Sequence, residues 1–263
     1  MRKLLQLLLL AISATALQAQ VAALNSAAHF VINQGNHPVG RSDFSIQTLK
    51  QGKISTPGAY TVNTHGTLTL PKTTYSFSGT GSLDANLGIL EENLNGIVNG
   101  SAVTFIAHGN AGSFAIDISA NGKSYQNTLN RPAQTVFFPD FDMSSYEILL
   151  NLRARHPGSG IAALIPKQTG ILSATALTPQ ADVQATLNGK ALTAHHASLS
   201  IGSVVSELYY SPDNHILEVD IPSQAFAIVH DNFQLQQPPP PPEETAPNGQ
   251  QPSGNGAPLS QPQ

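Results

Sequence analysis

The sequence predicts a mainly β fold: a strongly curved antiparallel sheet, either a half-barrel or an open barrel, with one central helix. Short stretches of alternating apolar and polar residues recur along most of the 263-residue chain. Two Asn-Gly pairs, the strongest two-residue hairpin signal, separate four of these stretches. Only one segment has a helical pattern. Because a sheet of about ten to fourteen strands must curl, close or double, a two-sheet β-sandwich is the alternative.

The N-terminus has the pattern of a secretory signal peptide. Two basic residues precede an apolar run at residues 4–12, and small residues follow. Cleavage is expected after Ala16 or Ala19, so residues 1–19 are interpreted as the signal peptide. The run is too short for a membrane anchor, since a span needs about 20 apolar residues. A periplasmic or secreted protein without a transmembrane span is therefore predicted.

The composition favours a β-protein outside the cytoplasm. Charged residues make up 11% of the chain, less than half of the usual share. The formal net charge of −4 comes without a basic patch, which argues against nucleic acid as a partner. The chain has no cysteine, so disulfides and thiolate metal sites are excluded. An exported domain of this kind must rely on its hydrophobic core.

The chain divides into one folded region and a tail. Residues 25–235 carry the strand patterns and predict a single β-rich domain. Five consecutive prolines, residues 238–242, follow, and the remainder is rich in Gln, Gly and Pro. Such a composition predicts a disordered tail over residues 236–263, with the proline run in polyproline II conformation. The tail is either a spacer or docking segment, or a loose chain end without a partner.

Before the helix, the strand patterns predict a series of hairpins. The first, over residues 28–46, turns near Gly35, and a second alternating stretch covers residues 58–70. Residues 101–129 show the clearest alternation, with a glycine-rich turn in the middle. Asn121-Gly122 then predicts a tight hairpin, because both turn positions must adopt positive φ.

After the helix, the same patterns resume. Residues 160–172 predict a strand that is broken by Pro166. Residues 182–201 predict a hairpin around Asn188-Gly189. Residues 204–221 predict another, with proline in a turn position that suits a type I turn.

The predicted helix begins at the only acid-rich stretch, FFPDFDMSSYEILLNLRARH. Ser144 and Glu147 have the spacing of a capping box, and Met143 and Ile148 that of a hydrophobic staple. Cationic residues at the far end and a Pro-Gly pair after them favour helix termination. Asp140 and Asp142 are interpreted as charges at the helix start, and an Asp-x-Asp metal site is the alternative.

Motifs of common enzymes are absent. The sequence has no Gly-x-Ser-x-Gly elbow, no phosphate-binding glycine loop and no dinucleotide fingerprint. Its histidines show neither His-x-His nor His-x-x-x-His spacing, so no metal or cofactor is expected. Glu218 and Asp220 could share one strand face as a glycosidase pair does, but a solvent-facing structural role is favoured. Glycan hydrolysis through this pair, or through Asp140 and Asp142, remains the enzymatic alternative.

The order of elements over residues 28–234 carries a resemblance. An opening hairpin FVINQGNHPVGRSDFSI precedes a β-meander and FFPDFDMSSYEILL, ALIP leads into a strand, and ELYYSPDNHILEVDIP follows. This order resembles exported bacterial β-domains of unknown function in the lipoprotein-carrier (LolA-like) half-barrel superfamily. It is also similar to the N-terminal β-domain of some secreted α/β-hydrolases. The resemblance implies a curved sheet with the helix on its concave side, a cavity that carriers use for acyl chains. The proline-rich tail stands where a hydrolase domain would follow, which implies no catalysis.

We therefore expect a non-enzymatic binding module of the cell envelope that holds an apolar or amphipathic ligand, such as a lipid, in the curved sheet. The candidate lining residues are Phe105, Phe114 and Ile116 on strands and Tyr146, Leu149 and Leu150 on the helix. Each of these could instead belong to a filled core. The alternative is a structural or scaffolding protein that docks on an envelope protein through the Pro-rich tail.

Overall fold

The structure is a computed structural model that describes residues 24–35, 37–49, 60–167 and 169–236. The expected signal peptide and all but one residue of the expected tail lie outside these ranges, so both stay predictions. None of the helices in the described ranges is long and apolar enough to cross a membrane.

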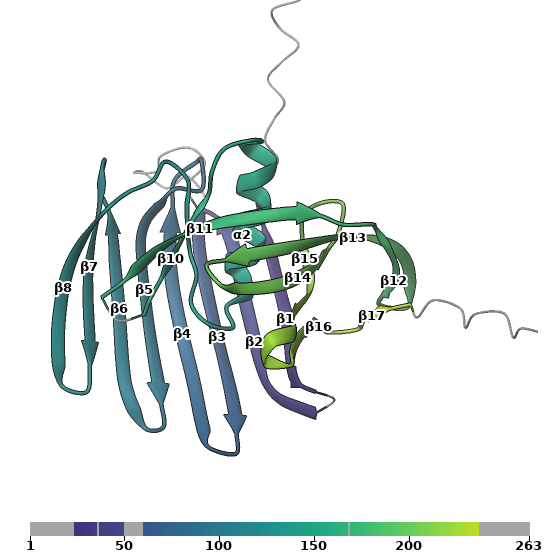
Figure 1. The fold of residues 1–263 in the computed structure, drawn as a ribbon, viewed down its shortest axis with the longest axis horizontal. Helices are drawn as coiled ribbons and strands as arrows, with labels where there is room; N and C mark the ends of the chain where they lie inside the picture. The colour runs from purple at the N-terminus through teal and green to yellow at the C-terminus, as the bar shows by residue number, and fades with distance from the viewer. Residues whose placement is uncertain (1–23, 36, 50–59, 168, 237–263) are drawn as a thin grey trace, which may run out of the picture.

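The first part of the chain is an antiparallel meander in which each strand pairs with the next (Figure 1). Its strands are β1 (Ser26–Gln34), β2 (His37–Thr48), β3 (Tyr60–Leu70), β4 (Thr73–Leu83), β5 (Ile89–Val98), β6 (Ser101–Gly109), β7 (Ser113–Ala120) and β8 (Lys123–Asn130). The short strand β9 (Thr135–Phe137) and the helix α2 (Met143–Arg155) follow.

The second part returns along the other side of β1. Its elements are β10 (Ala162–Ile165), β11 (Ile171–Pro179), β12 (Val183–Leu187), β13 (Lys190–Ile201), β14 (Val204–Tyr210), β15 (Ile216–Ile221), the 3₁₀ helix η1 (Pro222–Gln224), β16 (Phe226–His230) and β17 (Phe233–Leu235). Strand β16 pairs with β1 and joins both parts into one sheet of 17 strands. Strands β9 and β10 pair in parallel, and β12 pairs with β13 and β17.

The sheet stays open: in the described residues β8 pairs only with β7 and β9 only with β10, so these two edge strands do not close on each other. For the part of the chain that the structure describes, the prediction of a curved open antiparallel sheet with one α-helix is confirmed, and the sandwich alternative is wrong. The structure has 17 strands in its described residues, more than the ten to fourteen expected from the sequence. Strands β9 and β17 have only three residues each, too few to show an alternating pattern.

The hairpin turns follow local sequence. Asn121-Gly122 and Asn188-Gly189 both have positive φ at their two positions, as a two-residue hairpin requires. Asn99-Gly100, between β5 and β6, is a third such turn with φ of 49° and 81°. Its signal was present in the sequence but was not among the predicted turns.

Alternation along the strands places apolar side chains on the concave side of the sheet. Along β3, for example, Tyr60, Val62 and Leu68 are buried while Asn63 and His65 are exposed. Figure 1 shows α2 between the meander and the returning strands. Its residues are buried on almost all sides, so the helix fills the space that the curved sheet encloses. A smaller second cluster, which includes Leu217 and Phe233, lies apart from this core.

The helix begins two residues earlier than a Ser144 N-cap would allow. Asp142 is the N-cap, and its carboxylate accepts a hydrogen bond from the backbone N–H of Ser144. The predicted capping box is therefore wrong, because the nearer aspartate takes the cap position. Glu147 is consequently the fifth helical residue and bonds elsewhere, while Met143 and Ile148 are both buried within the helix. The basic residues Arg153 and Arg155 lie in the last turn, as expected.

Candidate functional site

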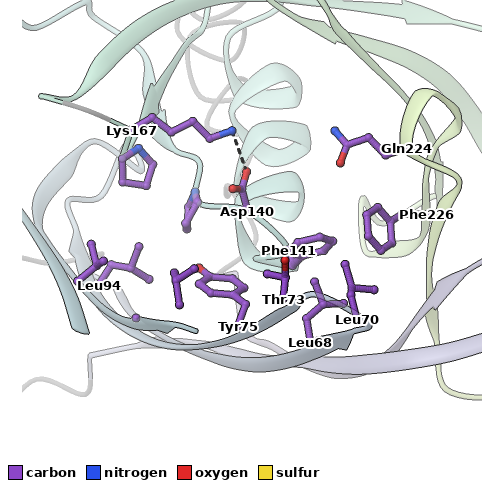
Figure 2. Close-up of a pocket in the computed structure, with 15 residues that line it drawn as sticks. Leu68, Leu70, Thr73, Tyr75, Leu94, Asp140, Phe141, Lys167, Gln224 and Phe226 are labelled. Atoms are coloured by element: carbon purple, nitrogen blue, oxygen red, sulfur yellow. Dashed lines mark ion pairs between the residues drawn. The ribbon is translucent and has the colours of Figure 1, made fainter. Parts of the chain in front are cut away.

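A pocket of about 380 Å³ lies on the concave side of the meander, opposite the segment that leads into α2 (Figure 2). Inward-facing residues of β3 to β6 form its floor: Leu68, Leu70, Thr73, Tyr75, Leu94, Gly96, Val98 and Val103. The other walls are Pro139, Asp140, Phe141, Pro166, Lys167, Gln224 and Phe226. We call this the first pocket. Its floor is mostly aliphatic because successive inward positions of neighbouring strands are Leu or Val.

A second pocket of about 190 Å³ adjoins the first. The two share five residues: Pro139, Asp140, Phe141, Lys167 and Gln224. The remaining walls of the second pocket are Phe138, Tyr146, Ile165, Ile201, Val204, Ser206 and Ile221. We call residues 138–142 the strap and the two pockets together the groove. Because strap residues line both pockets, the strap lies between them.

The strap is fixed at both ends. At one end, the backbone N–H of Phe138 donates to the Leu164 carbonyl at 2.8 Å. At the other, the buried Ser42 hydroxyl donates to the Phe141 carbonyl at 2.7 Å. Phe141 has φ of +64°, a conformation that bulky residues rarely adopt and that costs about 1–3 kcal/mol. The surrounding contacts therefore impose the shape of the strap.

The Phe141 ring stands between two other aromatic rings of the first pocket. It packs edge-on against Phe226 with a centroid distance of 5.1 Å. Its centroid lies 6.4 Å from that of Tyr75, at a tilted angle. Figure 2 shows the ring between these two side chains. The contacts with Phe226 and Tyr75 therefore fix the position of the Phe141 ring, which forms a wall of both pockets.

The charged groups of the groove lie at its rim. Lys167 Nζ and Asp140 Oδ1 are 3.3 Å apart, and both side chains are more than half exposed. An exposed pair of this kind contributes little to stability, about 0–1 kcal/mol. Both charges are consequently available to a polar group of a ligand, and Gln224 adds a neutral amide on the same rim.

Two tyrosines supply neutral hydroxyl groups. Burial raises the pKa of Tyr75 above its ordinary value, and the Asp140 and Asp142 carboxylates raise it further. Burial raises the pKa of Tyr146 to about 12, although a hydrogen bond with Ser206 acts in the opposite direction. Both hydroxyls remain protonated at ordinary pH, so each can donate a hydrogen bond.

Asp142, the last residue of the strap, and Glu92 on β5 are buried acids that do not line the groove. Asp142 Oδ1 accepts from Ser144 N at 3.0 Å, from Ser144 Oγ at 2.7 Å and from Thr64 Oγ1 at 2.9 Å. Burial nevertheless raises the pKa of Asp142. Burial also raises the pKa of Glu92 well above its usual range, and Asp142 and Glu91 raise it further. In the described ranges no group of three acidic or histidine side chains could hold a metal ion.

Asp140 and Asp142 do not act together. Asp142 is a buried helix cap, whereas Asp140 is exposed at the groove rim and paired with Lys167. Their separation follows from the strap, which turns sharply at Phe141 between them.

The Glu218–Asp220 pair is less exposed than the sequence suggested. Glu218 is buried, between Tyr209 and Val229 on neighbouring strands, and both of these pack on the second cluster. Burial and the neighbouring Asp220 raise the pKa of Glu218 to about 8. The expectation of a solvent-facing pair is wrong for Glu218, because a second apolar cluster covers that side of the sheet. Neither residue lines the groove.

Only one of the residues predicted to line a ligand site lies in the groove. Tyr146 forms part of the second pocket. The others are packed in the core, each at most 3% exposed: Phe105, Phe114, Ile116, Leu149 and Leu150. The floor residues Leu94, Val98 and Val103 were missed, since in the sequence they look like any other inward-facing strand positions.

No protein-family model matches the sequence, and no curated protein matches it. Among solved structures, the chain is similar to a β-barrel-like protein of DUF1849, a domain of unknown function, from Brucella abortus. The identity is 12% over 82% of this chain and 100% of that chain, with a TM-score of 0.50. A DUF1089 family protein from Pseudomonas aeruginosa gives 12% identity over 68% of this chain and 97% of that chain, with a TM-score of 0.41. At this identity the likeness to the Brucella protein concerns the fold alone, which is that of a β-barrel-like domain.

Proposed function

We propose that the protein is a non-enzymatic ligand-binding module of the cell envelope that holds an amphipathic molecule in the groove. The observation that carries the proposal is the pairing of an aliphatic floor with a charged rim. An apolar chain can lie on Leu68, Leu94 and Val103, while its polar end meets Lys167 and Asp140 at the mouth.

The size and chemistry of the first pocket support this function. Pockets that bind small molecules are usually about 300–1,000 Å³ in volume, largely apolar, and contain a few polar groups that fix orientation. The first pocket has about 380 Å³ and the same balance of side chains. Each methylene buried there would contribute about 0.8 kcal/mol, or roughly a fourfold gain in affinity.

The envelope location rests on the predicted signal peptide, and the class of ligand agrees with the resemblance to lipoprotein-carrier half-barrels. The groove lies on the concave side of the sheet, where such carriers hold acyl chains. The groove contains no pair of acids poised for glycan hydrolysis, since Asp142 caps the helix and Glu218 lies elsewhere. We therefore propose that the protein binds its ligand without catalysing a reaction.

The test is calorimetric titration of the mature protein with dodecanoate, comparing two variants of adjacent residues on β5. Val98 lines the first pocket and is 37% exposed, so Val98→Asn places an amide in the groove with little loss of packing. Ile97 is 50% exposed and does not line either pocket of the groove, which makes Ile97→Asn the matched control.

We expect one molecule of dodecanoate to bind the wild type, Val98→Asn to weaken binding about tenfold, and Ile97→Asn to leave it unchanged. If both substitutions changed the affinity for dodecanoate equally, the groove would not be the binding site. Failure of the wild type to bind would overturn the function itself and favour docking through the Pro-rich tail.

A further inference from the structure

The two pockets meet at one aromatic side chain. Phe141 lines both of them, whereas Leu70 and Phe226 line only the first and Val204 and Ser206 only the second. The five shared residues all belong to the strap or the rim. Opening a passage between the pockets would therefore require a change in the strap, in the rim, or in the Phe141 ring.

The Phe141 ring is the part of this boundary that can change without moving the backbone. The strap backbone is held by Ser42 at the Phe141 carbonyl and by the Asp142 cap one residue later. The ring, by contrast, is held by aromatic contacts to Phe226 and Tyr75, and by no hydrogen bond. A rotation of its side chain leaves both backbone anchors intact.

The two pockets also differ in chemistry. The floor of the first is mostly aliphatic. The second contains the hydroxyl groups of Tyr146 and Ser206 beside the apolar residues Ile165 and Ile201. A longer apolar chain would gain contacts in the second pocket, but only after passing the Phe141 ring.

We propose that Phe141 is the partition that limits the length of the bound apolar chain, so that the groove is one binding site of two connected pockets. The proposal rests on the proposed function, because it assigns a specificity to the same groove. Chains short enough for the first pocket bind with the ring in place. Longer chains bind only when the ring no longer separates the pockets.

The experiment measures the affinity of saturated carboxylates of increasing chain length. In the wild type, each added methylene should improve affinity about fourfold up to a limiting length, beyond which the gain stops. Phe141→Gly removes the ring and suits the positive φ of the strap, so the backbone shape should persist. The limit should then move to longer chains, with the fourfold gain per methylene continuing past the wild-type value.

Two further variants separate a removed partition from a merely larger pocket. Leu70→Ala enlarges the first pocket alone and should not move the limit by the same amount. Val204→Trp starts from a residue that is 39% exposed and fills only the second pocket. Combined with Phe141→Gly, Val204→Trp should restore the wild-type limit of chain length. Circular dichroism and thermal melting establish that each variant is folded.

An unchanged limit in folded Phe141→Gly, or a failure of Val204→Trp to restore it, would overturn the partition. Either result leaves wild-type binding of short chains, and hence the proposed function, standing. Absence of binding at every length in the wild type overturns the function instead.

Discussion

Glu147 on α2 and His215, in the turn between β14 and β15, form a hydrogen-bonded pair, with Glu147 Oε1 3.0 Å from His215 Nδ1. The Glu147 side chain is 1% exposed, and its other oxygen accepts from the backbone N–H of Ile216 at 3.2 Å. The pair thus ties the central helix to the returning half of the sheet. The sequence analysis placed the Glu147 carboxylate in a capping box. In the structure it instead binds His215 and Ile216, which are far from the helix in the sequence.

This pair predicts a pH-dependent contribution to stability. The hydrogen bond that His215 donates to Glu147 raises the pKa of His215, burial lowers it, and the charges of Glu147 and Asp213 raise it. A second histidine, His230, lines the same surface hollow as His215 and is the other titratable imidazole that faces it. Because the folded pKa lies above the unfolded value of about 6.5, the contribution is complete below pH 6.5 and is lost as the pH rises through the folded pKa.

His215→Gln should therefore reduce the free energy of unfolding more at pH 6 than at pH 8.5. Urea denaturation of both proteins at the two pH values measures the difference. Glu147→Gln, which keeps an acceptor for Ile216, should show the same pH trend. A difference between His215→Gln and wild type that stays constant with pH would show that the pair is not titrating.

A second prediction concerns the cap at Asp142. Asp142→Ala removes the acceptor for Ser144 and Thr64 and should cost about 1–3 kcal/mol of unfolding free energy. Asp142→Asn keeps an acceptor oxygen, and asparagine is as good an N-cap as aspartate, so its cost should be under about 1 kcal/mol. Denaturant midpoints measure both. Equal losses would mean that the negative charge, not the cap geometry, is what stabilises the helix start.

Glu92 gives a third prediction, with the opposite sign to that of an ordinary carboxylate. Its raised pKa means that the folded state binds the proton more tightly than the unfolded state. The contribution of Glu92 to stability should therefore fall as the pH rises from about 4.3, the unfolded pKa, towards the folded value.

Glu92→Gln removes this cost, so its advantage over the wild type should grow between pH 5 and pH 8. Unfolding free energies across that range provide the measurement. Glu91→Gln, on the exposed face of the same strand, is the control for loss of one negative charge and should not show this growth. A Glu92→Gln variant that is less stable than the wild type at pH 8 would contradict the account.

Local sequence rules were sufficient to predict the hairpin turns at two Asn-Gly pairs and the approximate position of the helix. Asn121-Gly122 and Asn188-Gly189 turn as expected because two adjacent positive φ values are a property of the dipeptide itself. The N-cap was misplaced because Ser144 and Glu147 satisfy one local motif and Asp142 satisfies another. Only the tertiary contacts of Glu147 with His215 and Ile216 decide between them.

The groove could not be found by such rules. Leu94 on β5, Phe141 on the strap and Phe226 on β16 are far apart in the sequence and meet only because β16 pairs with β1. The sequence points to Phe105, Phe114 and Ile116, the most regular apolar alternation in the chain. In the structure that regular alternation makes a filled core, and the groove lies where the strap and the rim approach the floor without filling it.

The most direct test of the ligand-binding account is a crystal structure of the mature protein with 12-bromododecanoate, whose bromine marks the end of the chain by anomalous scattering. The account predicts a single bromine peak within the first pocket, near Leu94 and Val103, with the carboxylate towards the rim at Lys167. A bromine peak elsewhere on the molecule, with the groove empty of ligand, would contradict it.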